Sequence, residues 1–195
     1  MKSRLSLRDK TKIDAWIREL EADGGGPAAE DEMLRKLELP YSLLGAGKHR
    51  AVFDLEDGSI LKVAKVAKGI ACNAREEDLF RRSPSGLRKH LCPIVEAGHG
   101  WLVMKRVTDR VPKKKKFERQ LRRILERFFF EEGLRISDIV GRNNGRPKRG
   151  NIRLHRGKRI VLIDYANVYP AEGEPPAVWS LLARSRKASD DEKPA

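Results

Sequence analysis

The sequence predicts an α+β fold with two lobes: an antiparallel sheet in the N-terminal lobe and a reduced helical C-terminal lobe. Three observations lead to this expectation. Between residues 41 and 64, three apolar segments are separated by glycine-containing turns, as in consecutive antiparallel strands. From Phe117 onward, apolar residues recur every three or four positions, which is the period of a helix with one buried face. The 195 residues are enough for one domain with a real core.

The N-terminal part is expected to form two amphipathic helices. Apolar residues at helical spacing predict the first helix over residues 10–21, and its apolar face must dock on something, most simply on the rest of the domain. These residues are Ile13, Trp16, Ile17 and Leu20. A glycine run after residue 23 breaks the chain. A second, shorter helix is then expected over residues 28–37.

The remaining elements follow from the change of period along the chain. Strands are expected over residues 41–44, 51–55, 59–64, 94–97 and 101–107. A helix is expected near residues 73–80, with a break at 83–86, and the long helix from Phe117 ends at Gly133. A loop-rich stretch leads to a hairpin of strands over residues 151–154 and 160–163, and a disordered tail is expected over residues 184–195.

Composition narrows the classes of function. The chain has 42 Lys and Arg against 28 Asp and Glu, and the formal net charge of +14 favours phosphate-bearing partners. No apolar run approaches the roughly 20 residues that span a bilayer, so we expect no membrane partner. The two cysteines, Cys72 and Cys92, do not make a disulfide scaffold, which indicates a reducing, cytoplasmic environment. No Cys/His cluster has zinc-ligand spacing.

A glycine-containing loop between two predicted strands is the first candidate binding element. Gly45, Ala46, Gly47 and Lys48 form the loop, and Val52 follows it on the second strand. Glycines let a backbone approach phosphate oxygens and leave N–H donors unhindered. A Walker A loop or a dinucleotide-binding fingerprint would open a helix, so the strand that follows excludes both. Taken alone, such a loop is more often only a hairpin turn.

A lysine inside an apolar strand strengthens the case for a binding site. Lys62 lies in the strand over residues 60–64, and a buried ammonium group there needs an opposite charge. Glu76, on the next predicted helix, is the best candidate partner, with Glu77 behind it. The alternative is an edge strand whose lysines point into solvent.

Polar residues in the second half have the spacing of a phosphoryl-transfer site. Asp138 and Asn143 follow the long helix five positions apart, and Asp164 ends an apolar strand. In a catalytic loop of this spacing, the Asp accepts the proton of the substrate hydroxyl and the Asn binds a metal ion. Asn151 lies 13 residues before Asp164 and is an alternative metal-binding asparagine, in which case Arg146 would occupy the base position.

Together these motifs resemble the protein-kinase-like superfamily, and most closely the small bacterial and phage proteins of the YrbL (PhoP regulatory network) family. The resemblance covers residues 39–179. It departs from the kinase pattern at three positions: Arg50 replaces the third glycine of the loop, Ser137 precedes Asp138 in place of an arginine, and Val140 stands where a kinase often has a lysine.

The resemblance implies a two-lobed ATP site. It implies an N-terminal helical extension over residues 1–38, an ATP-binding lobe over 39–107 and a reduced C-terminal lobe over 108–183. Asp138 and Lys62 would be catalytic, and Asn143 and Asp164 would hold Mg²⁺. ATP would contact Gly45, Ala46, Gly47, Lys48, Val52, Lys62, Glu76, Met104 and Val107, with Met104 to Val107 as the hinge.

Three functions remain as alternatives. The first is an ATP-dependent phosphotransferase acting on a protein or a small hydroxyl substrate. The second is a catalytically impaired, nucleotide-binding regulatory protein. The third is a basic nucleic-acid-binding protein on the same scaffold. The run Lys113–Lys116 and the basic residues around the proposed catalytic loop would flank one cleft, where they could recruit an acidic protein or nucleic acid. About thirty residues follow Asp164, so we expect no full helical lobe.

Overall fold

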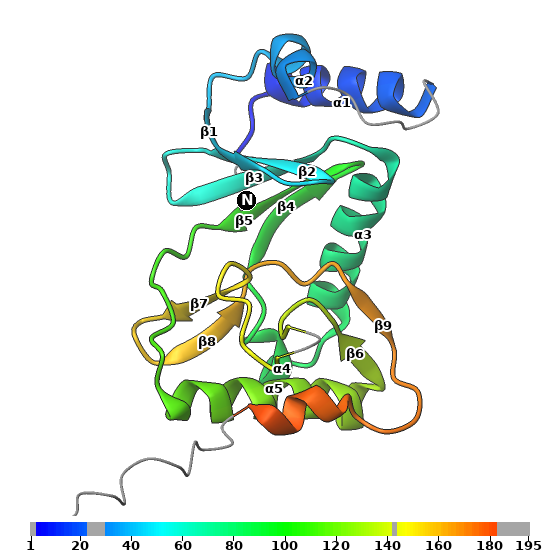
Figure 1. Cartoon of the computed structure of the whole chain (residues 1–195). Coiled ribbons are helices and arrows are strands. Elements are labelled where there is room, and N and C mark those ends of the chain that lie inside the picture. The colour runs from blue at the N-terminus through cyan, green and yellow to red at the C-terminus, as the bar shows by residue number, and fades with distance from the viewer. Residues whose placement is uncertain (1–2, 23–29, 142–143, 183–195) are drawn as a thin grey trace, which may run out of the picture.

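The computed structural model describes residues 3–22, 30–141 and 144–182, and its architecture is α+β (Figure 1). A five-stranded antiparallel sheet forms one part of the molecule, and helices with two small sheets form the other. The strands of the large sheet are β1 (Ser42–Ala46), β2 (Arg50–Asp54), β3 (Ser59–Ala64), β4 (Ile94–Gly98) and β5 (Trp101–Lys105). Their order in space is β1-β2-β3-β5-β4. The predicted tail over residues 184–195 lies outside the described residues.

Five α-helices and four short strands complete the described chain. The helices are α1 (Leu7–Ala22), α2 (Glu30–Leu37), α3 (Ala67–Arg82), α4 (Ser85–Arg88) and α5 (Lys115–Glu132), and η1 (Ala177–Leu181) is a 3-10 helix. The two-stranded sheets pair β6 (Leu134–Ile136) with β9 (Val168–Pro170) and β7 (Ile152–His155) with β8 (Arg159–Leu162). Among the described residues, no helix has the length and apolar character that a bilayer crossing requires.

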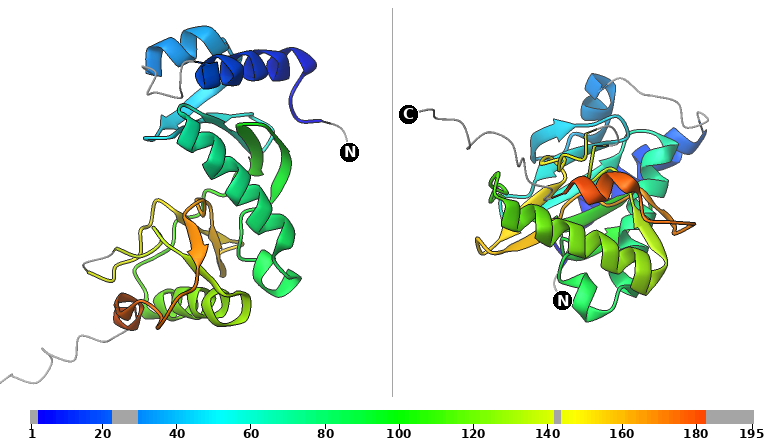
Figure 2. Two further views of the ribbon diagram at one scale, coloured as in Figure 1. Left: turned by 90° about the vertical axis from the view of Figure 1, so that its right-hand side faces the viewer. Right: turned by 60° about the horizontal axis from the view of Figure 1, so that its bottom comes forward.

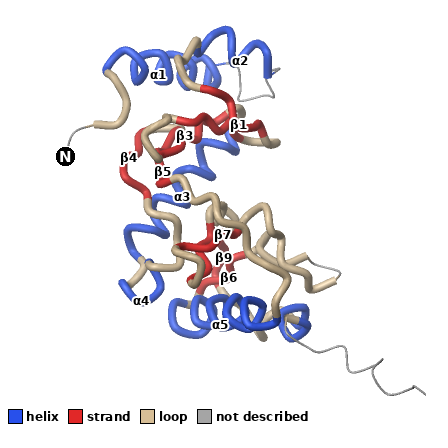
Figure 3. Tube along the Cα trace, turned by 90° about the vertical axis from the view of Figure 1, so that its left-hand side faces the viewer, coloured by secondary structure: helices blue, strands red, loops and turns tan. Residues whose placement is uncertain are grey.

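Helices α1 and α2 cover one face of the large sheet, on the side away from the second half of the molecule (Figures 1 and 3). The predicted stripe of α1 is buried there, with Ile13 fully inaccessible and Trp16 only 4% exposed. The indole of Trp16 also donates a hydrogen bond of 2.8 Å to the carbonyl of Ala64 at the end of β3. The apolar face of α1 therefore docks on the chain's own sheet, as predicted.

Strand β3 lies in the interior of the sheet, between β2 and β5. Lys62 is opposite Val52 on one side and Leu102 on the other, and its side chain is almost fully buried. The alternative of an edge strand with its lysines in solvent is therefore wrong for Lys62. A central strand places this ammonium group where only protein groups or a bound ligand can compensate its charge.

Helix α3 connects the two halves of the molecule (Figure 2). It begins six residues before the predicted start at residue 73, and Gly69 in its first turn explains how close it lies to the β1–β2 hairpin. A Cβ atom at Gly69 would lie 2.1 Å from the carbonyl oxygen of His49, so only glycine fits there. Further along, Leu79 belongs to the core of the second half. The predicted break at residues 83–86 is shorter than expected, since α4 already begins at Ser85.

Helix α5 lies along the bottom of the second half in Figure 1, at the end away from the large sheet. Its apolar stripe is buried as predicted, and it ends at Gly133, which has the left-handed φ of 63° and donates its N–H to Phe128. The expected loop-rich stretch after Gly133 instead begins with β6, which pairs with β9. Three-residue strands with a partner more than thirty positions away leave little periodic signal in a sequence.

Candidate functional site

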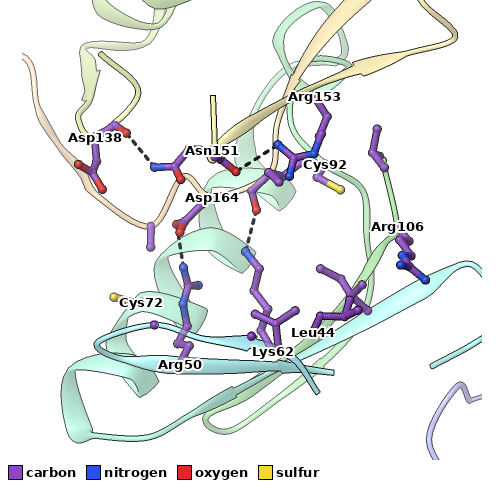
Figure 4. A pocket seen from close by; sticks show the side chains of 18 of the residues that line it. Leu44, Arg50, Lys62, Cys72, Cys92, Arg106, Asp138, Asn151, Arg153 and Asp164 are labelled. Carbon is purple, nitrogen blue, oxygen red and sulfur yellow. Dashed lines mark hydrogen bonds and ion pairs between the residues drawn. The ribbon is translucent and has the colours of Figure 1, made fainter. Parts of the chain in front are cut away.

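A cavity of about 840 Å³ lies between the β1–β2 hairpin and the loops around β7 and β8 (Figure 4). Most of the predicted site residues line it. These are Gly45, Ala46, Gly47, Lys48, Val52, Lys62, Val107, Asp138 and Asp164. Met104 in β5 and Glu76 in α3 are not among the lining residues, because both are fully buried. Asn143 lies outside the described residues.

Lys62 and Glu76 form a buried ion pair on the sheet side of this cavity. The ammonium nitrogen of Lys62 lies 2.9 and 3.2 Å from the two carboxylate oxygens of Glu76, and it also donates to the carbonyl of Ile163 at 2.8 Å. Glu76 is completely inaccessible and accepts a further hydrogen bond of 2.9 Å from the backbone N–H of Tyr165. The pair therefore ties β3 and α3 to the segment after β8.

Arg50, at the start of β2, extends into the same cluster. Its guanidinium lies 3.0 Å from a carboxylate oxygen of Glu76 and 2.7 Å from Oδ1 of Asp164, and it donates to the side chain of Asn73 at 3.2 Å. Sequence reasoning noted Arg50 only as a missing glycine. The alternation of β2 contained the signal, since residues 50 and 52 share one face of the strand, and Val52 was already assigned to the site.

Asp164 follows β8 and reaches the cavity, where its carboxylate meets the guanidinium of Arg50 (Figure 4). Burial alone would raise the pKa of the Asp164 carboxyl, but the charges of Lys62 and Arg50 outweigh it and lower the pKa below its ordinary value. Conversely, burial would lower the pKa of the Arg50 guanidinium, and the charges of Glu76 and Asp164 raise it instead. Both groups are therefore charged across the neutral pH range.

Asp138 approaches the cavity from the opposite side. Its carboxylate is ion-paired with Lys148, and its backbone carbonyl accepts a hydrogen bond of 2.8 Å from the side-chain amide of Asn151. The backbone carbonyl of Asn151 in turn accepts from Ile163, one residue before Asp164. Asn151, Asp138 and Asp164 thus come together on one wall of the cavity, although 13 positions separate each neighbouring pair in sequence.

The loop between Asp138 and Asn151 explains this proximity. The N–H of Lys148 donates to the carbonyl of Ile139, and Val140 pairs with Pro147, so the chain leaves the cavity at residue 139 and returns at 148. Residues 145–150 therefore belong to a loop that closes on itself and lengthens the stretch between Asp138 and Asn151. Asp138 and Asn151 lie side by side under this arrangement, whereas Arg146 is exposed and does not line the cavity.

The oxygen atoms on this wall suit a hard divalent cation that is also coordinated by a bound molecule. Among the described residues, no group of three or more His, Cys, Asp and Glu side chains is placed to hold a metal ion. Mg²⁺ does not need such a group, because it is usually bound by one or two carboxylates together with phosphate oxygens and water. The Asp164 carboxylate and the Asn151 amide supply that chemistry, so the residues fit Mg²⁺ brought in with phosphates.

The rest of the cavity wall is strongly basic. Lys105, Arg106, Arg110 and Arg153 also line the cavity. Within the part of the chain that the structure describes, the guanidinium of Arg153 donates to backbone carbonyls alone, and burial and the charge of Arg110 lower its pKa. The basic run at residues 113–116, by contrast, does not line this cavity. An anionic ligand is therefore favoured by the cavity itself.

Comparisons with known proteins bear on the fold alone. No family model matches the chain, and no curated protein matches it. A structure of the bifunctional kinase-methyltransferase WbdD is similar with a TM-score of 0.52 at 17% identity, covering 67% of this chain and 33% of WbdD. A second WbdD structure gives 0.51 at 15% identity, covering 70% and 35%. A kinase from Legionella pneumophila gives 0.47 at 16% identity, covering 72% and 54%.

The chain spans about a third of the length of the WbdD chains that it matches. Over that length the five-stranded antiparallel sheet and its helices match. The chain therefore has a kinase-like α+β fold.

Proposed function

We propose that this chain binds ATP with Mg²⁺ in the cavity between a lobe over residues 39–107 and a reduced lobe over residues 108–183, and transfers a phosphoryl group to a protein or small hydroxyl substrate. The observation that carries the proposal is the buried pair of Lys62 and Glu76, whose lysine lines the same cavity as Asp164. A strand lysine, a helix glutamate and a metal-binding aspartate are the parts that position nucleotide phosphates in kinases. We also propose that the chain is a member of the YrbL family, which the sequence motifs support.

The glycines of the hairpin are better explained by a ligand than by the fold. A Cβ atom placed on Gly45 would meet nothing within 4 Å, and on Gly47 it would meet only a carbonyl oxygen at an ordinary 3.7 Å. Neither residue has a positive φ. The chain itself therefore does not require glycine at these positions, in contrast to Gly69. A side-chain-free backbone over a basic cavity is what close approach to phosphates requires.

The opposite wall would supply the chemistry of transfer. Asp138 would accept the proton of a substrate hydroxyl, and its ion pair with Lys148 would hold its carboxylate at the cavity wall. Asp164 and Asn151 would hold Mg²⁺, which supplies positive charge to the phosphates when it is bound. We propose Asn151 for this role because it lines the cavity beside Asp138; the earlier candidate, Asn143, stays a prediction.

The test combines thermal denaturation with a radiolabelled phosphotransfer assay, with and without Mg-ATP. We expect saturating Mg-ATP to raise the melting temperature of the wild type by about 5–10 °C, as ligand at a hundred times its Kd should for a chain of this size. Each variant is compared with its own ligand-free melting temperature. The shift should be lost in Lys62→Ala and Asp164→Asn and kept in Lys68→Ala, which removes an exposed lysine of α3. Asn151→Ala and Asn143→Ala, assayed for transfer, identify the metal-binding asparagine.

A second candidate function is nucleotide binding without transfer, and the engagement of Asp164 by Arg50 favours it. A melting shift with Mg-ATP but no labelled product on any acceptor would support this candidate over phosphotransfer. No shift with any nucleotide would rule out both. Nucleic-acid binding, which the charge of +14 favours, would then be expected to show a steep salt dependence.

A further inference from the structure

The fold does not require the contact between Arg50 and Asp164. Glu76 already has charged and hydrogen-bonding partners in Lys62 and the N–H of Tyr165. Asp164 is different, because 43% of its side chain remains exposed and its only ion pair among the described residues is with Arg50. An aspartate that is this accessible would be solvated without an arginine. The contact therefore has a weak structural rationale and calls for a functional one.

The contact also occupies the atom that a metal ion would use. The guanidinium of Arg50 lies 2.7 Å from Oδ1 of Asp164, and its other contacts hold it in place through Glu76 and Asn73. A divalent cation bound to Asp164 would meet a fixed positive charge at contact distance. Arg50 is 9% exposed, so the guanidinium is not screened by bulk water.

We propose that Arg50 competes with divalent cations for Asp164, so that this site binds a metal ion only when a phosphate-bearing ligand draws the guanidinium away. The inference rests on the proposed function, since it assigns the regulation of the same site. Arg50 lines the cavity beside Gly47 and Lys48, where phosphate oxygens would offer it an alternative partner. Phosphate would draw Arg50 away and leave Asp164 free to hold the metal, and a metal on Asp164 would leave Arg50 free to pair with phosphate. Each would therefore promote the binding of the other.

The competition makes a prediction about metal affinity without nucleotide. Arg50→Gln removes the charge and keeps most of the side chain, so it should bind Mn²⁺ more tightly than the wild type. Breaking one charge-assisted hydrogen bond corresponds to about a ten- to hundredfold gain in affinity. Arg50→Lys keeps a cation and should stay near the wild type. Lys68→Gln removes a nearby exposed charge and controls for the general effect of net charge on metal binding.

Mn²⁺ binding is measured by electron paramagnetic resonance on the full chain, first alone and then with ATP. The gain of Arg50→Gln should vanish in the double variant Arg50→Gln/Asp164→Asn, which locates the metal at Asp164. ATP should increase the Mn²⁺ affinity of the wild type more than that of Arg50→Gln. Melting temperatures show whether each variant is folded, and Arg50→Met, which also removes the charge, carries the comparison if Arg50→Gln is not folded.

The outcomes separate this inference from the proposed function. Equal Mn²⁺ affinity in wild type and Arg50→Gln, a gain no larger than that of Lys68→Gln, or no Mn²⁺ binding by any variant would each overturn the competition. A wild-type level of affinity is the result expected of Arg50→Lys, and a gain there as large as in Arg50→Gln would also overturn it. If Arg50→Gln gains affinity for Mn²⁺ while no variant binds ATP, the competition holds and the nucleotide site does not exist.

Discussion

The two walls of the cavity are held in different ways. On the sheet side, Lys62, Glu76 and Arg50 are buried, and together they make five contacts of 3.4 Å or less within their cluster and to Asp164. On the other side, Asp138 and Lys148 form an ion pair with 44% and 43% of their side chains exposed. The first wall is determined by the interior of the fold, and the second by a loop.

This difference implies that, under the proposed function, nucleotide binding and phosphoryl transfer depend on different walls of the cavity. A buried charge must be compensated, so the sheet-side wall cannot change without a cost in stability. The loop-side wall can change at little cost, because exposed charges are solvated whether or not they are paired. Substitutions in the two walls should therefore have opposite signatures, with large effects on stability at the first and large effects on activity alone at the second.

Glu76→Ala should have the largest effect on stability. It leaves the charges of Lys62 and Arg50 buried without their shared carboxylate, and removing one partner of a buried ion pair costs about 3–5 kcal/mol. Urea denaturation measures the free energy of unfolding. Glu77→Ala is the matched control, since it breaks a surface pair with Arg81 on the same helix and should cost less than about 1 kcal/mol. Equal losses in the two variants would show that the buried cluster does not hold the wall.

The stability of the chain should depend on pH through His90, which lies where residues 90–92 pair with β8. Its ring is 8% exposed and lies 3.0 Å from the carbonyl of Ile160, and burial, followed by the charges of Lys89, Arg159 and Arg127, lowers its pKa below 6.5. Below pH 6.5 the unfolded chain thus binds a proton that the folded chain resists, so stability should fall as the pH drops from 7 to 5.

His90→Gln has no titrating group at this position, so its stability should fall less over the same range. Urea denaturation at pH 7, 6 and 5 gives both slopes. Parallel slopes in wild type and variant would mean that His90 does not contribute to the pH dependence. The backbone of residues 90–92 pairs with Leu162, so a loss of stability here weakens the attachment of β8 and, with it, the position of Asp164.

The same contrast explains what could be predicted from the sequence. The contact of Lys62 with Glu76 was predictable because an ammonium group in an apolar strand requires a carboxylate and the next helix offers one. Arg50 could have been placed in the cavity by strand alternation, but the comparison with a glycine pattern drew attention only to what was missing.

The arrangement of the loop-side wall was harder to predict from the sequence. The five-residue spacing favoured Asn143, whereas the residue that the structure brings to Asp138 is Asn151, through a loop that closes between Ile139 and Lys148. Spacing assumes a loop of standard length, and nothing in the local sequence states where a longer loop returns. For the same reason, the pairing of β6 with β9 has no local signature.

Asp138→Asn should have the smallest effect on stability and a large effect on transfer. Asp138 has a φ of 69°, a conformation that asparagine tolerates well, so the backbone is kept and only the charge is lost. Losing an exposed pair with Lys148 should cost less than about 1 kcal/mol. Removing the base should lower the rate of phosphotransfer by about 10²–10⁴.

The measurements for this variant are urea denaturation, Mg-ATP-induced melting shift and initial rate of transfer. Asp78→Asn is the control, because it breaks a surface pair with Arg82 on α3 that is more exposed still and does not line the cavity. Both variants should keep the melting shift, and only Asp138→Asn should lose transfer. A variant at Asp138 that transfers at the wild-type rate would remove this residue from the chemistry, and one that unfolds as readily as Glu76→Ala would show that the two walls are held alike.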